Sequence, residues 1–156
     1  MSLAQKLADK LDAPNIDGTV VSVAENGEQL TARVDTAGTL AVRLLELRLA
    51  TDKLTGAPIA HVKQVAEKLT RQVTYLLEPI QPIESDAEAC VVQMRSTKPE
   101  QSSGVATYYE VLVKTGGTIS LHRYEKPRGG LRKEIAMNLT KEVVKRLADD
   151  FLGAVA

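Results

Sequence analysis

A long alternating segment near the C-terminal end of the chain constrains the fold more than any other feature. From Val105 to Lys114, β-branched and aromatic side chains alternate with a second set of residues, which is the period of a β-strand. A second strand is predicted from Ile119 to Glu125. Because only a short glycine-containing loop separates the two segments, they predict an antiparallel hairpin.

Burial decides the register of this hairpin. A three-residue loop, Thr115 to Gly117, places the apolar side chains of both strands on one face, whereas a two-residue loop mixes the faces. Gly117 then supplies the residue with positive φ that such a loop needs. The preferred register has two inner pairs and two outer pairs: Val113 with Ile119 and Val111 with Leu121 inside, Tyr108 with Tyr124 and Glu110 with His122 outside.

The residues after the hairpin have the period of a long amphipathic helix. Apolar side chains recur there every four residues, at Ile135, Leu139, Val143, Leu147 and Phe151. We expect this stripe to lie on the sheet. Its burial should be the largest single apolar contribution to folding, at ~1.5–3 kcal/mol for each fully buried aliphatic side chain.

The N-terminal part of the chain predicts a short helix and then a three-stranded meander. Ser2 and Gln5 form a capping-box pattern at the start of a helix that ends before Pro14. Asn26-Gly27 is a strong hairpin signal, and a two-residue turn there pairs Val23 with Leu30 and Val21 with Ala32. A second turn at residues 36–38 is expected to pair Val34 with Leu40 and Ala32 with Val42.

The middle of the chain is less clearly patterned. Residues 44–54 fit a bulged strand or a helix from Thr39 to Leu54, and a strand to about Leu47 is preferred because it continues the meander. Pro58 opens a second helix. The remaining expectations are a strand at 73–77, a turn at 84–86, a strand at 90–95 containing Cys90, and a flexible loop at 97–104.

These elements predict an α+β fold formed by a single domain, residues 1–156. The expected order is α-βββ-α-ββββ-α, with a curved antiparallel sheet of about seven strands packed against the long C-terminal helix. This order is similar to that of chaperone-like folds of the type III secretion class and, over residues 39–152, to helix-grip and TATA-binding-like repeats. No diagnostic motif accompanies the order, so it assigns no family.

Composition limits the classes of function. Twenty basic and twenty acidic residues give a formal charge of zero, which argues against nucleic acid or a membrane surface as the partner. The single cysteine fits a reducing compartment, and no apolar run approaches the ~20 residues of a membrane span. We therefore expect a soluble, cytoplasmic protein.

Residues with catalytic chemistry do not form a recognised pattern. His61 and His122 are too scattered, with one cysteine, to predict a metal site. Cys90 is in phase with apolar neighbours, which is typical of a core cysteine and not of a nucleophile. Glu110 beside His122 could form an acid–base pair, but the preferred interpretation is an ordinary cross-strand surface pair. The sequence thus predicts that the protein is not an enzyme and has no cofactor.

Two surfaces are candidate binding sites. Basic residues and a Gly-Gly turn precede the expected helix in residues 123–133, and a helix start can hold an anion. The anion-site candidates are Arg128, Gly129, Gly130 and Arg132, with a solvated basic turn as the plain alternative. The outward tyrosine pair suits a protein interface, and its candidates are Tyr108, Tyr124, Arg123 and His122.

The leading hypothesis is a protein-binding module, similar to a small chaperone or adaptor and homodimeric through unprotected sheet edges. The alternative is a small-ligand carrier with a pocket between the sheet and the C-terminal helix. A third hypothesis is weak anion, nucleotide or RNA binding at the basic loop. A cavity lined by Val111, Leu121 and Leu139 favours the carrier, and a filled core with a flat apolar outer patch favours the adaptor.

Overall fold

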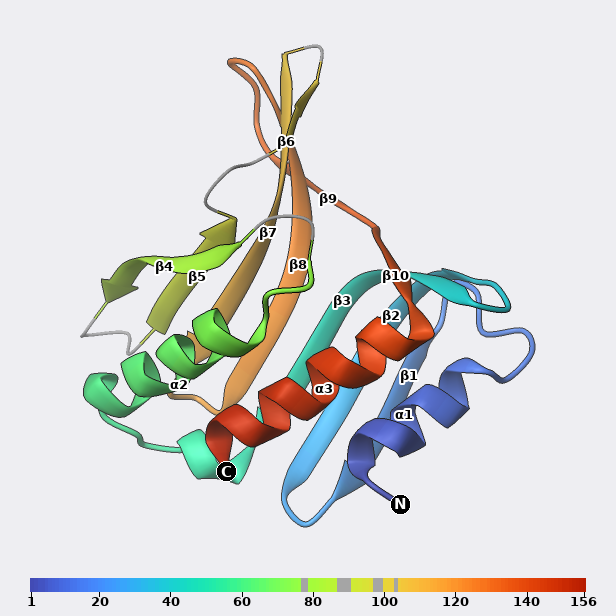
Figure 1. The fold of residues 1–156 in the computed structure, drawn as a ribbon, viewed down its shortest axis with the longest axis horizontal. Coiled ribbons are helices and arrows are strands. Elements are labelled where there is room, and N and C mark those ends of the chain that lie inside the picture. The colour runs from blue at the N-terminus through green and yellow to red at the C-terminus, as the bar shows by residue number, and fades with distance from the viewer. Residues whose placement is uncertain (77–78, 87–90, 97–99, 103) are drawn as a thin grey trace.

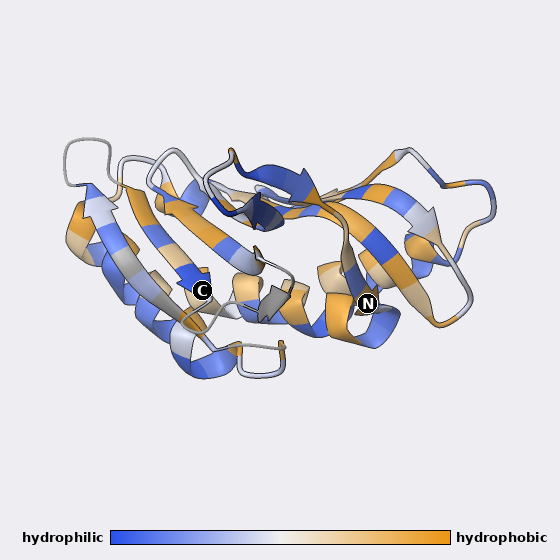
Figure 2. Ribbon diagram, turned by 90° about the horizontal axis from the view of Figure 1, so that it is seen from above, coloured by the Kyte–Doolittle hydropathy of each residue, from blue (hydrophilic) through white to orange (hydrophobic). Residues whose placement is uncertain are grey.

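The computed structural model describes residues 1–76, 79–86, 91–96, 100–102 and 104–156. Within these residues, ten strands form one antiparallel sheet, and three helices lie on one of its faces (Figures 1 and 2). The expected α+β class and the packing of the C-terminal helix on the sheet are confirmed. Of the seven strands after α2, three are only three or four residues long (β6, β9 and β10), which explains why four were expected.

The first half of the chain contains two helices and three strands. The elements are α1 (Leu3–Leu11), β1 (Val20–Glu25), β2 (Glu28–Ala37), β3 (Ala41–Thr51), a 3₁₀ turn (Asp52–Leu54) and α2 (Ile59–Gln72). The second half contains the remaining strands and the last helix. These are β4 (Ile80–Asp86), β5 (Val91–Ser96), β6 (Glu100–Ser102), β7 (Val105–Lys114), β8 (Thr118–Pro127), β9 (Lys133–Ile135), β10 (Met137–Thr140) and α3 (Lys141–Val155).

The strand order across the sheet is β1-β2-β3-β8-β7-β5-β4. β3 and β8 join the two halves of the chain, and they pair at Leu47–Leu121 and Leu49–Ile119. Beyond this pairing the two strands separate, and β9 and β10 fill the space by pairing with β8 and β3 respectively (Figure 1). The β7–β8 hairpin extends past the helices at its other end, where β6 pairs with β7.

The two hairpin registers that burial selected are confirmed. β1 pairs with β2 at Val23–Leu30 and Val21–Ala32. β7 pairs with β8 at Val113–Ile119 and at Val111–Leu121. Gly117 has a φ of +106° and donates its N–H to the Lys114 carbonyl at 3.0 Å, as a glycine-dependent loop requires.

The predicted register between the second and third strands is wrong. Ala32 pairs with Leu47 and Val34 with Leu44, because the turn lies at residues 38–40 and not at residues 36–38. β2 continues to Ala37, where it pairs with Val42, and Leu40 is 80% exposed instead of paired with Val34. The preferred strand over residues 44–47 is confirmed, and it continues to Thr51.

The predicted start of the C-terminal helix is also wrong. α3 begins at Lys141, where the Thr140 hydroxyl accepts the Val143 N–H at 3.1 Å. Ile135 and Leu139 lie in β9 and β10, and Leu139 pairs with Val42 of β3. A spacing of four residues keeps side chains on one face of a strand as well as one face of a helix, so the apolar period did not separate the two.

Three shorter expectations in the middle of the chain need correction. α2 runs to Gln72 with Val73 as its C-cap, and residues 74–76 are not a strand. Residues 84–86 belong to β4 and do not form a turn, and residues 100–102 of the expected loop form β6. Cys90, Leu77 and residues 97–99 and 103 lie outside the described residues.

The space between α3 and the sheet is filled by apolar side chains. α3 lies between α1 and α2 (Figure 1), and Phe151 and Leu147 are fully buried beneath it. Val111, Leu121 and Leu139 are each at most 5% exposed and belong to one continuous apolar cluster. A filled core at these three residues is the arrangement that was expected of an adaptor, whereas a cavity there was expected of a carrier.

Both outer strands of the sheet carry features that oppose further strand pairing. At β1, Lys10 of α1 donates to the Ser22 carbonyl at 3.1 Å. β4 contains Pro82, which lacks an N–H, and a register shift between Pro82 and Glu84. Its exposed Glu84 and Asp86 add like charges. Prolines, bulges and charges are the usual protection of edge strands, so the argument for an edge-paired homodimer is lost.

Among the described residues, the helices are all too short or too polar to cross a membrane.

Candidate functional site

The face of the sheet opposite the helices is not covered by any helix of the described chain (Figure 2). We call it the open face. Cross-strand partners share a face of a sheet, so the registers identify the rows of side chains that cross it. One row is Gln93, Leu112, Ser120, Arg48 and Thr31. A second row runs through Glu110 and contains Arg95, Glu110 and His122. Glu46 and Arg33, which pair with each other on β3 and β2, lie on the neighbouring strands.

Glu110 is the centre of the open face. Its side chain is only 1% exposed although it lies on the uncovered side of the sheet. Its Oε2 accepts hydrogen bonds from Gln93 Nε2 at 2.7 Å and from Arg132 Nη1 at 2.7 Å. Arg95 Nη2 lies 3.4 Å from the same oxygen. The buried carboxylate is therefore compensated by two guanidinium groups and an amide, as a buried charge must be.

The electrostatics keep this group of residues charged. Burial raises the pKa of Glu110, but the hydrogen bonds from Arg132 and Gln93 and the charges of Arg132 and Arg95 outweigh burial and hold the pKa below its ordinary value. The hydrogen bond to Glu110 raises the pKa of Arg132. Near neutral pH this pair therefore stays ionised, so its geometry suits recognition by fixed charges and not proton transfer.

The tyrosine pair is present but differs from the expected exposed patch. Tyr108 and Tyr124 are cross-strand partners with ring centroids 6.0 Å apart. Arg95 lies 4.7 Å above the Tyr108 ring and Arg132 lies 3.9 Å above the Tyr124 ring. Tyr108 is 5% exposed and Tyr124 is half-buried. Both rings therefore lie beneath arginine side chains, and the guanidinium groups form the outer layer.

His122 has a different partner from the one that the hairpin register indicated. It is the cross-strand neighbour of Glu110, but its Nε2 lies 2.8 Å from Glu46 Oε2 on β3. Arg33 of β2 lies 3.6 Å from Glu46 and also pairs with Glu134 of β9. These contacts form a second ionic group on the open face, next to Glu110 because His122 is its cross-strand neighbour.

Arg123, the fourth interface candidate, belongs to the opposite face. It is 7% exposed, stacks 4.3 Å from the ring of Tyr109, and donates from Nη2 to Thr107 Oγ1 at 3.1 Å. The structure therefore brings together Tyr108, Tyr124 and His122, but not Arg123.

The four anion-site candidates do not stand at a helix start. Arg128, Gly129 and Gly130 form the turn between β8 and β9, and α3 begins only at Lys141. Arg132 is paired with Glu110, as described above. A hollow of about 520 Å³ lies beside Arg128 and Gly129 at the end of the β7–β8 hairpin. The helix dipole no longer supports an anion site here, and binding at Arg128 stays a prediction.

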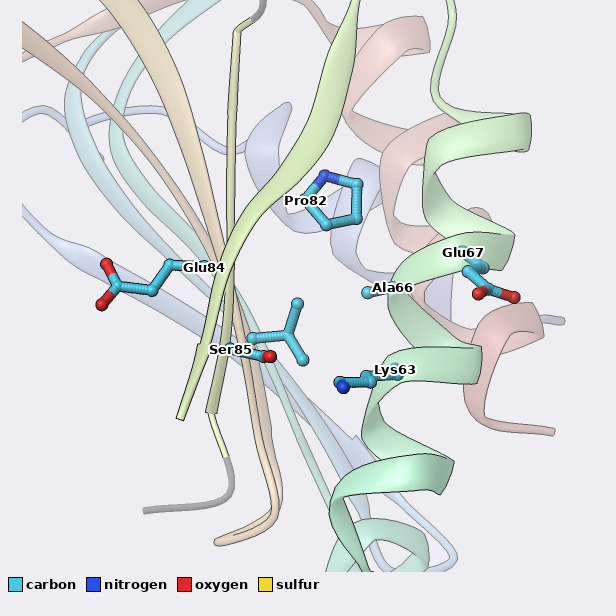
Figure 3. A pocket seen from close by; sticks show the side chains of 7 residues that line it. Lys63, Ala66, Glu67, Pro82, Glu84 and Ser85 are labelled. Carbon is cyan, nitrogen blue, oxygen red and sulfur yellow. The ribbon is translucent and has the colours of Figure 1, made fainter. Parts of the chain in front are cut away.

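Two further hollows flank the β4 edge. Between α2 and β4, about 290 Å³ is floored by the buried Ala66 and Val92 and rimmed by Lys63 and Pro82, while Glu84 points away to the open face (Figure 3). On the open face, about 380 Å³ is lined by Glu84, Asp86, Leu112, Glu110 and Arg132, among others. Because the second hollow contains the buried carboxylate, it is the better candidate site.

Metal chemistry receives no support from the part of the chain that the structure describes, where no three His, Cys, Asp or Glu side chains are grouped as metal ligands. His61 lies on α2, away from His122 on β8.

Sequence reasoning missed two of the three residues that bond Glu110, Gln93 and Arg95, and it gave the third, Arg132, the role of an anion ligand. Gln93 and Arg95 come from β5 and Arg132 from the segment before β9, and no motif links these segments. The one available signal was a glutamate at the middle of the outer face of the longest hairpin, where a partner was to be expected.

Comparison of the chain with protein-family models, with curated proteins and with solved structures gives no match. Function is therefore inferred from the geometry of the open face alone.

Proposed function

We propose that this protein is a non-enzymatic protein-binding module, adaptor- or chaperone-like, whose partner docks on the open face of the sheet. One observation carries the proposal: three helices cover one face, and the uncovered face holds an ordered network of arginine, tyrosine and glutamate side chains centred on Glu110. Tyrosine and arginine are among the residues most enriched at the centres of protein interfaces.

The order of the network supports binding in a second way. Stacking on tyrosine and pairing with Glu110 already restrict the long side chains of Arg95 and Arg132. Immobilising such side chains on binding costs roughly 0.5–1.5 kcal/mol each, so a preordered surface binds with a smaller entropic loss. Among the side chains that the structure describes, the large exposed apolar ones are Met1, Val20, Leu40 and Leu131, which come from four separate segments and give no support to the flat apolar patch expected of an adaptor. The partner surface should accordingly be polar.

The carrier hypothesis has less support, because the side chains that were to line its pocket lie in the filled core. Self-association through strand edges is disfavoured by the protected β1 and β4. A homodimer, if formed, should bury the open face. Light scattering at micromolar concentration tests it: a mass near 16.9 kDa excludes the homodimer and leaves a different protein as the partner.

Site-specific photo-crosslinking tests the proposal in the cells that make the protein. A benzophenone amino acid replaces Leu112 or Arg48 on the open face, and Glu142 or Arg71 on the helix side serves as the matched control. We expect one discrete adduct from each open-face position and none from the controls. Adducts of equal yield from the helix side, or none from the open face, would refute the proposal.

A further inference from the structure

Arg132 occupies a cage whose shape and charge suit any guanidinium group. Its Nη1 lies 2.7 Å from Glu110 Oε2 and its Nη2 lies 3.5 Å from Oε1, while the guanidinium stacks 3.9 Å from the Tyr124 ring. A carboxylate that accepts hydrogen bonds from both terminal nitrogens of a planar guanidinium group, together with an aromatic ring to stack on, favours arginine over lysine. Because Glu110 is 1% exposed, this acceptor is built into the sheet.

Arg132 is held mainly by this cage. It follows the Gly129-Gly130 turn, and neither Leu131 nor Arg132 belongs to a strand. Leu131 is 92% exposed, and β9 begins only at Lys133. The Arg132 side chain can therefore leave the cage without breaking the hydrogen bonds of the sheet, and its own 39% exposure leaves it accessible from solvent.

The approach to the cage is acidic. The open-face hollow of about 380 Å³ beside Arg132 has Glu84 and Asp86 on its rim and Glu110 at its floor. The cations of the lining are Lys114 and Arg132. When Arg132 swings out, three carboxylates face two cations, Lys114 and the Arg95 that lies 3.4 Å from Glu110. The emptied site therefore keeps an excess of negative charge and attracts a basic group.

From this geometry we propose that Glu110, Tyr108 and Tyr124 form a guanidinium-binding site, that Arg132 occupies it within the chain, and that a partner protein docks by inserting an arginine of its own. The proposal rests on the proposed function and names the chemistry of the partner: a basic segment with at least one exposed arginine. Arg132 is then a self-ligand that the partner must displace.

Competition within the chain has a measurable consequence. A tethered ligand acts at an effective concentration on the order of millimolar. Removal of Arg132 should therefore strengthen the binding of an arginine-bearing segment, whereas removal of an interface contact normally weakens it. This reversed sign separates a displaceable self-ligand from an ordinary ion pair.

The first test uses the purified full-length Arg132→Ala variant and titrates it with ethylguanidinium or ethylammonium, followed by amide chemical shifts. We expect saturable binding of ethylguanidinium, at least about tenfold tighter than ethylammonium, and its loss in the Arg132→Ala/Glu110→Gln double variant. Equal response to the two cations, or none, overturns the proposal. If Arg132→Ala does not fold, Arg132→Gln carries the same titration.

The matched control is Arg146→Ala. Arg146 also stacks on a tyrosine, 4.0 Å from the Tyr75 ring, but the Tyr75 hydroxyl is bonded to Asp150, which is only partly buried. We expect no selective ethylguanidinium binding by this variant. Selective binding equal to that of Arg132→Ala would assign the effect to any emptied arginine position and overturn the proposal.

The second test compares a short glycine-flanked peptide containing two arginines with its lysine counterpart. We expect the arginine peptide to bind Arg132→Ala at least about tenfold more tightly than wild type, since the self-ligand is gone; equal or weaker binding overturns the proposal. Selective binding without open-face cross-links would refute the proposed function alone. Cross-links without guanidinium binding would refute the present inference alone.

Discussion

Replacement of Glu110 by glutamine should destabilise the fold in a pH-dependent way. The substitution keeps the size of the side chain but removes the charge that faces Arg132 and Arg95. Breaking a fully buried ion pair costs about 3–5 kcal/mol, and a hydrogen bond to a charged group contributes about 1.5–3 kcal/mol. The two arginine side chains are 39% and 34% exposed and can regain water. We therefore expect a loss of about 2 kcal/mol in the free energy of unfolding at pH 7.

The sign of the pH dependence follows from the depressed pKa of Glu110. Its stabilising contribution is fully present above the unfolded-state pKa, near the ordinary value of 4.5, and is lost as the pH falls through the lower folded-state pKa. The difference between wild type and Glu110→Gln should therefore be largest at neutral pH and should shrink below about pH 4.5.

Urea unfolding followed by circular dichroism, at pH 7 and in steps down to pH 3, measures this difference. Glu25→Gln is the control, because the Lys6–Glu25 pair is exposed on both sides and should contribute less than about 1 kcal/mol. A Glu110→Gln variant within 0.5 kcal/mol of wild type at pH 7, a margin of the order of a surface substitution, would refute the reasoning. So would a difference that does not change with pH.

Three other substitutions test the packing. Leu139→Asp places a charge at a 5% exposed position of β10 and should abolish the native near-UV circular dichroism; a native spectrum and melting temperature would contradict the core. Gly117→Ala should cost more stability in urea than Gly129→Ala, because both have positive φ but only at Gly117 does a Cβ meet the Thr51 carbonyl, at 2.7 Å; equal losses would contradict the loop geometry. Tyr75→Phe removes the 2.5 Å hydrogen bond to Asp150 and should cost about 1.5–3 kcal/mol in urea unfolding, and an unchanged midpoint would show that this bond does not tie α3 to the segment after α2.

The parts of the fold that the sequence predicted were those where burial leaves one choice. In β7 and β8 a shift of one residue would move Val111 and Leu121 into water, so the alternation alone determined the register. At β2 and β3 the register was missed because the turn falls at residues 38–40 and not at residues 36–38, and alternation does not determine where a turn lies. At Ile135 and Leu139 the spacing fits a strand as well as a helix, and the pairing of Leu139 with Val42 decides between them.

The centre of the open face could not be predicted for a related reason. Placing Tyr124 beside Tyr108 required one hairpin, but placing Arg132 over Tyr124 required β9 to return along β8. Arg95 required the register of β5 against β7. Each position depends on tertiary pairing between separate segments, which local periodicity does not contain.

The crystal structure of the Arg132→Ala variant grown with ethylguanidinium tests the central claim most directly. We predict a guanidinium ion between the Glu110 carboxylate and the Tyr124 ring, in place of the Arg132 side chain, with Arg95 still over Tyr108. A cage that has closed, or that Arg95 has filled by moving from Tyr108 to Tyr124, would show that the site exists only to pair arginines of this chain.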